Sequence, residues 1–188
     1  MATATDAVLS DLPDLAFTRM LDAPRDLVFQ AWTDARHVAA WWGPTGFSNP
    51  VCEVDPRRGG RFAVHMQAPN GTIYPGGGVF LEIAAPERLI FTSTLEGRSG
   101  QILLEAVNSV TFEDFGRRTR LHLNARVVSA AAESAGKLGG MEEGWAQSLE
   151  RLAGILKAAG GVARPTPRSV LSYSAGPELV REFREMPV

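Results

Sequence analysis

The sequence predicts an α+β fold in which a long helix near the C-terminus covers one face of an antiparallel sheet. From Phe47 to Val128, apolar residues recur at every second position in segments separated by turn-forming residues, which is typical of about six consecutive strands. One strand and two short helices precede this region. An amphipathic helical segment follows it and can cover the dry face of the sheet. The predicted element order is therefore β-α-α-β6-α.

The composition is that of one globular domain. Of 188 residues, 45% are hydrophobic, which is enough for a substantial core. The formal net charge is -2 without a run of like charges, so neither a nucleic-acid partner nor a membrane anchor is expected. The chain lacks an N-terminal signal pattern and a span of about 18 apolar residues, so we expect a cytoplasmic protein. The single cysteine, Cys52, excludes an internal disulfide and is expected to be a small buried apolar residue.

The first strand is predicted at 15–21 (LAFTRML). Pro24 then begins a short helix, because proline is favoured at the first helical position, and this helix should end near Trp32. It carries Asp26 in its first turn, where a negative charge stabilises the helix dipole.

A second short helix follows directly. Thr33-Asp34 can cap its start, and Gly43-Pro44 ends it, because proline cannot continue a helix. Two adjacent tryptophans stand at this end. We expect Trp42 to turn inward and Trp41 to pack against the sheet or a loop.

The strands show which face is dry. TRLHLNARV (119–127) alternates most clearly, with apolar residues at the odd-numbered positions, and RFAVHMQ (61–67) repeats the pattern. RLIFTSTLE (88–96) has apolar residues at both parities. We assign Phe91 and Ser93 to the dry face, although a slip of one residue would bring their even-numbered neighbours inward instead.

The covering helix is predicted from Met141 to Ala159. Its apolar stripe recurs at steps of three or four residues and consists of Met141, Trp145, Leu149, Leu152 and Leu156. The preceding segment, 130–140, carries three glycines within five positions, which should break a helix. We therefore expect 130–140 to be a mobile loop.

These patterns divide the chain into three parts. Residues 1–14 form an N-terminal extension, 15–159 form the domain, and 160–188 form a C-terminal tail rich in proline. Within the tail, 177–185 can form a short amphipathic helix. We expect 15–159 to fold without the tail.

Several motifs in this order resemble a known superfamily. They are FTRMLDAPRDLVFQAWTD, WWGPTGF, EVDPRRGGRF, APNG, EIAAPERLIFT, VTFED and GWAQSLERLAGIL. Together they resemble the START-like (SRPBCC) superfamily over about residues 15–158, and within it the group named after the activator of the heat-shock-protein-90 ATPase. The resemblance implies the helix-grip fold, in which a curved antiparallel sheet of about seven strands grips a long C-terminal helix around a cavity. The superfamily includes lipid carriers, hormone binders, cyclases and co-chaperones, so the fold leaves the function open.

The side chains assigned to the dry face are the candidates for contact with a ligand. Aromatic and methionine side chains dominate them, which suits a flat or flexible apolar molecule. The candidates are Trp42, Phe62, Val64, Met66, Phe91, Ser93, Val110, Phe112, Met141, Trp145 and Leu149.

Catalytic motifs are missing. The three histidines lie far apart, and no metal-binding, nucleophile or phosphate-binding motif occurs, so we expect no metal ion and no cofactor. The triple glycine at 76–78 opens no helix and predicts a bulge or bend in a strand. Glu53, Asp55 and Glu82 are the acids to consider, because a carboxylate inside an apolar cavity would have a raised pKa and could act as a general acid or base. We expect them instead to be charges on the rim or the wet face, with Asp55 stabilising the turn before Pro56.

Three functions follow as hypotheses. The leading one is binding of a small apolar molecule in the cavity, without catalysis. The second is a cyclase- or hydrolase-like enzyme that uses Glu53 or Glu82 as its base. The third is an interaction protein that contacts a chaperone or forms a homodimer.

Overall fold

The computed structural model describes residues 14–97, 99–131 and 135–160. Its elements follow the predicted order, with one additional two-residue strand. They are β1 (Asp14–Leu21), α2 (Arg25–Thr33), α3 (Ala35–Trp41), β2 (Ser48–Val54), β3 (Arg61–Gln67), β4 (Ile73–Tyr74), β5 (Gly76–Ala84), β6 (Arg88–Glu96), β7 (Ile102–Phe115), β8 (Arg118–Ala130) and α4 (Ala135–Gly160).

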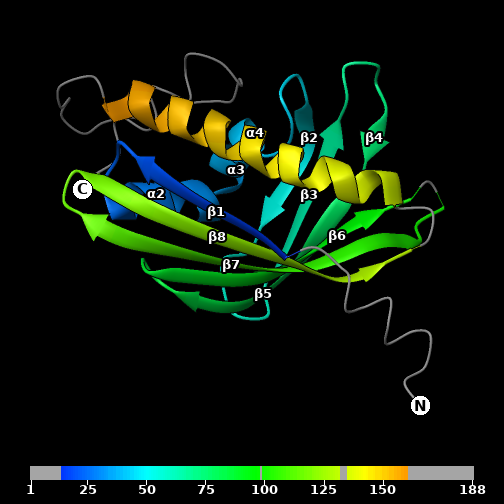
Figure 1. The fold of residues 1–188 in the computed structure, drawn as a ribbon, viewed down its shortest axis with the longest axis horizontal. Helices are drawn as coiled ribbons and strands as arrows, with labels where there is room; N and C mark the ends of the chain where they lie inside the picture. The colour runs from blue at the N-terminus through cyan, green and yellow to red at the C-terminus, as the bar shows by residue number, and fades with distance from the viewer. Residues whose placement is uncertain (1–13, 98, 132–134, 161–188) are drawn as a thin grey trace.

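One antiparallel sheet contains all the strands. Seven follow one another in the order β1-β8-β7-β6-β5-β3-β2, and β4 pairs with β3 outside this path. The sheet curls, and α4 crosses its concave side, while α2 and α3 lie near one end of the sheet (Figure 1). Helix α2 packs against β7 and β8, and α3 packs against β2 and α4. The predicted α+β helix-grip fold is therefore confirmed.

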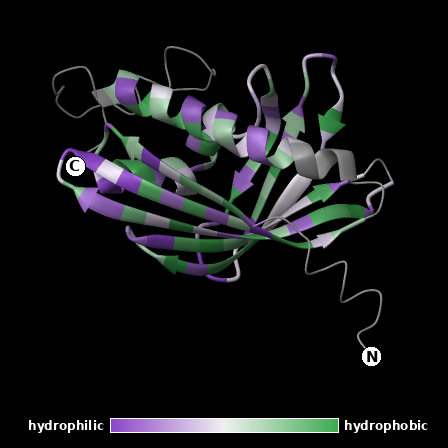
Figure 2. Cartoon of the chain, in the orientation of Figure 1, coloured by the Kyte–Doolittle hydropathy of each residue, from purple (hydrophilic) through white to green (hydrophobic). Residues whose placement is uncertain are grey.

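The predicted alternation of dry and wet faces is also confirmed. Hydrophobic and hydrophilic bands alternate along the strands in Figure 2. On β8, Leu121, Leu123 and Ala125 are buried. On β6, Leu89 and Phe91 are buried, so the odd-numbered residues of this strand face the interior. This settles the parity that the sequence left open, in favour of the assignment made above.

Helix α4 begins earlier than the sequence predicts. It starts at Ala135 rather than Met141, so Gly136, Gly139 and Gly140 lie within it. The expectation of a loop is therefore wrong for residues 135–140. Each glycine costs about 1 kcal/mol relative to alanine, but extending a formed helix adds one hydrogen bond per residue and needs no new nucleus.

The other parts of the boundary predictions lie outside the described residues. Strand β1 begins at Asp14, one residue before the predicted domain boundary. The extension up to residue 13, the segment 132–134, the tail after Gly160 and its predicted helix at 177–185 are not described. Among the described helices, none combines the length and apolar character that a membrane span needs.

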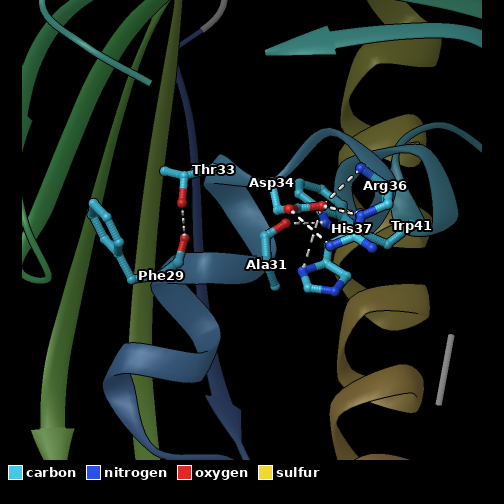
Figure 3. Close-up of polar contacts among 7 residues, drawn as sticks. All are labelled: Phe29, Ala31, Thr33, Asp34, Arg36, His37 and Trp41. Carbon is cyan, nitrogen blue, oxygen red and sulfur yellow. Dashed lines mark hydrogen bonds and ion pairs between the residues drawn. The ribbon is translucent and has the colours of Figure 1, made fainter. Parts of the chain in front are cut away.

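The α2–α3 junction is held by side-chain hydrogen bonds (Figure 3). Asp34 lies between the two helices, and its side chain accepts from the backbone N–H groups of Arg36 and His37. This cap is the one that the sequence predicts. The Trp41 indole Nε1 donates to the Ala31 carbonyl at 2.8 Å, which ties the end of α3 to α2.

The cap gives a prediction with a pH dependence. Burial raises the pKa of Asp34, but nearby His37 and Arg36 together lower it by more than burial raises it. The pKa of Asp34 therefore lies below its ordinary value of 3.8. An acid whose pKa is lower in the folded than in the unfolded protein stabilises the fold at pH values above its unfolded-state pKa. This contribution is lost as the pH falls through the folded-state pKa. We expect Asp34→Ala to lower the free energy of unfolding by about 1 kcal/mol at pH 7.

The measurement is urea unfolding of both proteins between pH 7 and pH 2. The difference between them should shrink as the pH falls below 3.8. Asp34→Asn is the matched control, because asparagine also caps helices but carries no charge. A difference that stays constant down to pH 2 would show that the charge of Asp34 contributes nothing.

Candidate functional site

A cavity of about 390 Å³ lies between α4 and the sheet. Its wall comes from the α3–β2 connection, from five strands and from the first turns of α4. Most of the lining side chains are apolar, and none of those in the described part of the chain is charged. The lining residues are Trp42, Gly43, Pro44, Phe47, Phe62, Val64, Met66, Tyr74, Gly76, Gly77, Ser93, Thr94, Leu95, Leu104, Gly140, Met141, Gly144, Trp145 and Ser148.

Most of the candidates from the sequence lie in this wall. Those that line the cavity are Trp42, Phe62, Val64, Met66, Ser93, Met141 and Trp145. Phe91, Val110, Phe112 and Leu149 do not line it and belong to the buried core. Trp32 of α2 covers Phe91 and Phe112, with ring centroids 6.2 and 6.1 Å away. The dry face was assigned correctly, but α2 and α3 fill one end of it and leave the cavity at the other.

Aromatic rings separate the cavity from this core. The Trp42 ring lies 5.0 Å from Trp145 and 5.9 Å from Phe62, measured between centroids. On the core side, Trp32 stacks on Trp145 with centroids 6.1 Å apart. Trp41 is fully buried behind this layer and packs on Trp32 at 4.6 Å. Trp42 therefore faces the cavity, as expected, and Trp41 is a core residue that packs on α2.

Arg151 of α4 holds the chain segment that carries Trp42. Its Nη2 donates to the Ala40 carbonyl at 2.8 Å, and its Nη1 lies 3.3, 3.0 and 3.1 Å from the carbonyl oxygens of Trp42, Gly43 and Pro44. The last carbonyls of a helix lack partners within the helix, and a cation there is favourable. Burial lowers the pKa of Arg151. No sequence pattern predicts this contact, because 107 or more residues separate the partners.

Further bonds fix the same segment. The Gly43 N–H donates to the Ser148 hydroxyl at 3.0 Å. Asn49 Nδ2 donates to the Ala39 and Trp42 carbonyls at 2.9 and 2.8 Å. Gly43 has a φ of +93°, which favours glycine. Two adjacent tryptophans at a helix end are therefore part of a rigid corner, with one ring in the core and one in the cavity wall.

The triple glycine at 76–78 lets strands come close beneath the cavity. A Cβ on Gly76 would lie 2.8 Å from the Thr94 carbonyl oxygen, and a Cβ on Gly77 would lie 2.7 Å from that of Phe62. The predicted bulge is not at these glycines, because Gly76 and Gly77 pair in register with β6. The irregularity of this strand lies between Phe80 and Glu82.

Neither candidate base enters the cavity. Glu53 is exposed on β2, and its neighbours Cys52 and Val54 pack against the core instead. Glu82 forms a bidentate pair with Arg88, with distances of 2.9 and 2.6 Å. These hydrogen bonds lower the pKa of Glu82, which is the opposite of what a cavity base needs. Asp55 binds Arg57 at 2.9 Å on the surface.

Other reactive groups are also poorly placed for catalysis. Burial raises the pKa of the Cys52 thiol to about 12, so the thiol stays protonated. His122 lies on the outer face, where it contacts the Thr18 hydroxyl at 2.9 Å and Glu113 at 3.3 Å. In residues 14–97, 99–131 and 135–160, no three His, Cys, Asp or Glu side chains gather as a metal site would require.

Comparison with known proteins now gives the family. Residues 22–157 match the family described as "Activator of Hsp90 ATPase homolog 1-like protein". The chain belongs to this family. Its members have the START-like fold that the sequence motifs predict, and that fold is consistent with a ligand-binding cavity. None of the curated proteins matches the chain.

Solved structures support membership of the Activator of Hsp90 ATPase homolog 1-like family. A protein from Arthrobacter aurescens is 27% identical, with a TM-score of 0.69, and the match covers 77% of this chain and 86% of that one. One from Nitrosomonas europaea is also 27% identical, with a TM-score of 0.66 and coverage of 79% and 97%. A third, from Chromobacterium violaceum, is 26% identical, with a TM-score of 0.64 and coverage of 77% and 96%.

Part of the cavity wall is not predicted by the sequence patterns. The missed residues lie in the α3–β2 connection, in β4, in the glycine run, at the ends of β6 and β7 and on α4; they are Gly43, Pro44, Phe47, Tyr74, Gly76, Gly77, Thr94, Leu95, Leu104, Gly140, Gly144 and Ser148. Phe47 and Tyr74 could have been found, because each is an aromatic residue close in sequence to a predicted wall residue. The glycines and Ser148 carry no apolar signal.

Proposed function

We propose that this protein binds a small, largely apolar molecule in the cavity beneath α4. The observation that supports the proposal is a cavity of about 390 Å³ whose described lining is mostly apolar and uncharged. This volume lies in the range of about 300–1,000 Å³ typical of ligand pockets. An aromatic molecule of the size of an indole side chain buries about 250 Å², which is worth about 6 kcal/mol before the costs of binding.

The enzyme alternative is not supported by its candidate bases, because Glu53 and Glu82 lie outside the cavity. The interaction alternative has less support among the described residues. The exposed large apolar residues of the described chain are spread over five strands, with Ile102 and Phe115 at opposite ends of β7; they are Met20, Val51, Ile73, Leu81, Ile102 and Phe115. Single exposed apolar residues are normal on a protein surface. Ligand binding is therefore the function that we carry forward.

Filling the cavity from α4 tests this function. Gly144 lines the cavity, and a Cβ there would meet only Pro44, at 4.0 Å. Gly144→Leu should therefore occupy the ligand space while improving helix propensity. We expect this change to weaken binding of the uncharged fluorophore N-phenyl-1-naphthylamine at least tenfold in a fluorescence titration.

Gly154→Leu is the matched control. Gly154 lies on the same helix but is exposed, and a Cβ there meets nothing within 4 Å. Its affinity for the fluorophore should stay within twofold of the wild-type value. No binding by the wild-type protein, or equal binding by both leucine variants, would contradict a ligand site in this cavity.

A further inference from the structure

One serine hydroxyl in the cavity wall keeps its proton free. Ser93 lines the cavity, and its Oγ accepts a hydrogen bond from Asn108 Nδ2 at 2.8 Å. Asn108 is fully buried, and its Nδ2 also points to the Phe91 carbonyl oxygen at 3.4 Å. That carbonyl can only accept, and the amide nitrogen of Asn108 faces it, which leaves the buried Asn108 Oδ1 without a partner. Ser93 is thus held as an acceptor by Asn108, and its own O–H has no acceptor among the described residues.

The other serine and threonine hydroxyls of the wall are already used. Thr94 donates to the Gly77 carbonyl at 3.0 Å. Ser148 donates to the Gly144 carbonyl at 2.7 Å and accepts from Gly43. Neither has a proton left for a ligand. Ser93 therefore differs from them in being a donor that only a ligand or a water molecule can satisfy.

Ser93 also lies at the inner limit of the cavity on β6. Leu95, two residues away, lines the cavity, whereas Phe91, two residues in the other direction, is part of the closed core. A polar group without a partner in such surroundings costs free energy. A ligand that places an acceptor against Ser93 removes this cost and gains orientation.

The charge of the acceptor follows from the same surroundings. Ser93 and Asn108 are both uncharged, and no described cavity residue carries a positive charge. An ionised carboxylate at this depth would lose its hydration without gaining an ion pair. A neutral carbonyl oxygen is a weaker acceptor but is far cheaper to desolvate.

We propose that the cavity selects uncharged ligands that carry a carbonyl oxygen, such as aromatic ketones or esters, and that Ser93 donates the hydrogen bond to this oxygen. This inference rests on the proposed ligand-binding function. It adds the chemical class of the ligand and its orientation: the carbonyl faces β6, and the apolar body lies among Trp42, Trp145 and Met66.

Three naphthalenes of similar size test this selection. We expect 2-acetylnaphthalene to bind, 2-ethylnaphthalene to bind through apolar contact alone, and 2-naphthoate to bind more weakly than the ketone. In Ser93→Ala, affinity for the ketone should fall about tenfold, which corresponds to one hydrogen bond. Affinity for 2-ethylnaphthalene should change less than twofold. Isothermal calorimetry measures all three.

The matched control is Ser109→Ala, because Ser109 follows Asn108 on β7 and lies on the opposite face, outside the cavity. This variant should bind the ketone as the wild type does. A second test uses the wild-type protein and so does not depend on the folding of the Ser93 variant. The infrared carbonyl stretch of isotope-labelled 2-acetylnaphthalene should lie at lower frequency when bound than in hexane.

The outcomes separate this inference from the function on which it rests. If none of the three naphthalenes binds, the ligand site itself is contradicted. If the ketone and 2-ethylnaphthalene bind and Ser93→Ala weakens both equally, the hydrogen bond is contradicted while the ligand site stands. An unshifted carbonyl stretch, or 2-naphthoate binding more tightly than the ketone, would overturn the proposed selectivity.

Discussion

Replacing Trp41 with alanine is expected to lower the free energy of unfolding by about 4 kcal/mol, because truncating a buried tryptophan leaves a large cavity. Trp41 is fully buried, and its indole N–H donates to the Ala31 carbonyl at 2.8 Å. The change thus removes packing against Trp32 and leaves that carbonyl without its partner. Urea unfolding followed by circular dichroism measures the loss without relying on tryptophan fluorescence.

Trp145→Ala is the counterpart in the cavity wall. Trp145 faces the cavity on one side, so its removal should destabilise the fold less than Trp41→Ala does. It should change the affinity for N-phenyl-1-naphthylamine more, because the fluorophore loses an aromatic wall. Equal effects of the two substitutions on binding would contradict the division into a core tryptophan and a wall tryptophan.

Arg151→Met should lower the free energy of unfolding by about 3 kcal/mol, because several hydrogen bonds from a charged group to backbone carbonyls are lost together. The carbonyl of Ala40 would lose its Arg151 donor, as would those of the following segment from Trp42 to Pro44. Methionine retains the apolar stem and so isolates the role of the guanidinium. Urea unfolding again gives the magnitude.

Arg126→Met is the control for this change. Arg126 is exposed on β8, and its replacement should alter stability by no more than about 0.5 kcal/mol. Arg151→Lys should retain part of the stability, because an ammonium group has fewer donors and a different geometry. If Arg151→Met costs no more than Arg126→Met, the guanidinium does not hold the end of α3.

The sequence predicts the faces of this fold well because alternation is a local property. The odd-numbered residues of β6 and β8 could be placed inward by counting in twos. Counting does not show how far along a face a residue lies. Phe91 and Ser93 share one face, yet α2 covers the first and the cavity borders the second. That division depends on where distant helices pack.

Other features of the structure also depend on contacts that a local pattern does not show. The register of β5 against β6 shifts between Phe80 and Glu82, and Leu81 is exposed at this irregularity. The pairing of Glu82 with Arg88 joins two strands and could not be read from spacing alone. Helix propensity is local and predicts a break at Gly136, Gly139 and Gly140, whereas α4 is a 26-residue helix lying across the sheet.

The glycine run of β5 restricts how this protein can change over time. A side chain at Gly76 or Gly77 would press on the backbone of a neighbouring strand, and one at Gly78 would overlap the Thr92 carbonyl. Backbone cannot yield as a flexible side chain can, so natural variation is largely barred from this part of the wall. Variation in the cavity wall is therefore expected in side chains outside the glycine run, such as Met66 of β3 or Met141 of α4. Members of the family are expected to share the glycines and to diverge at such positions.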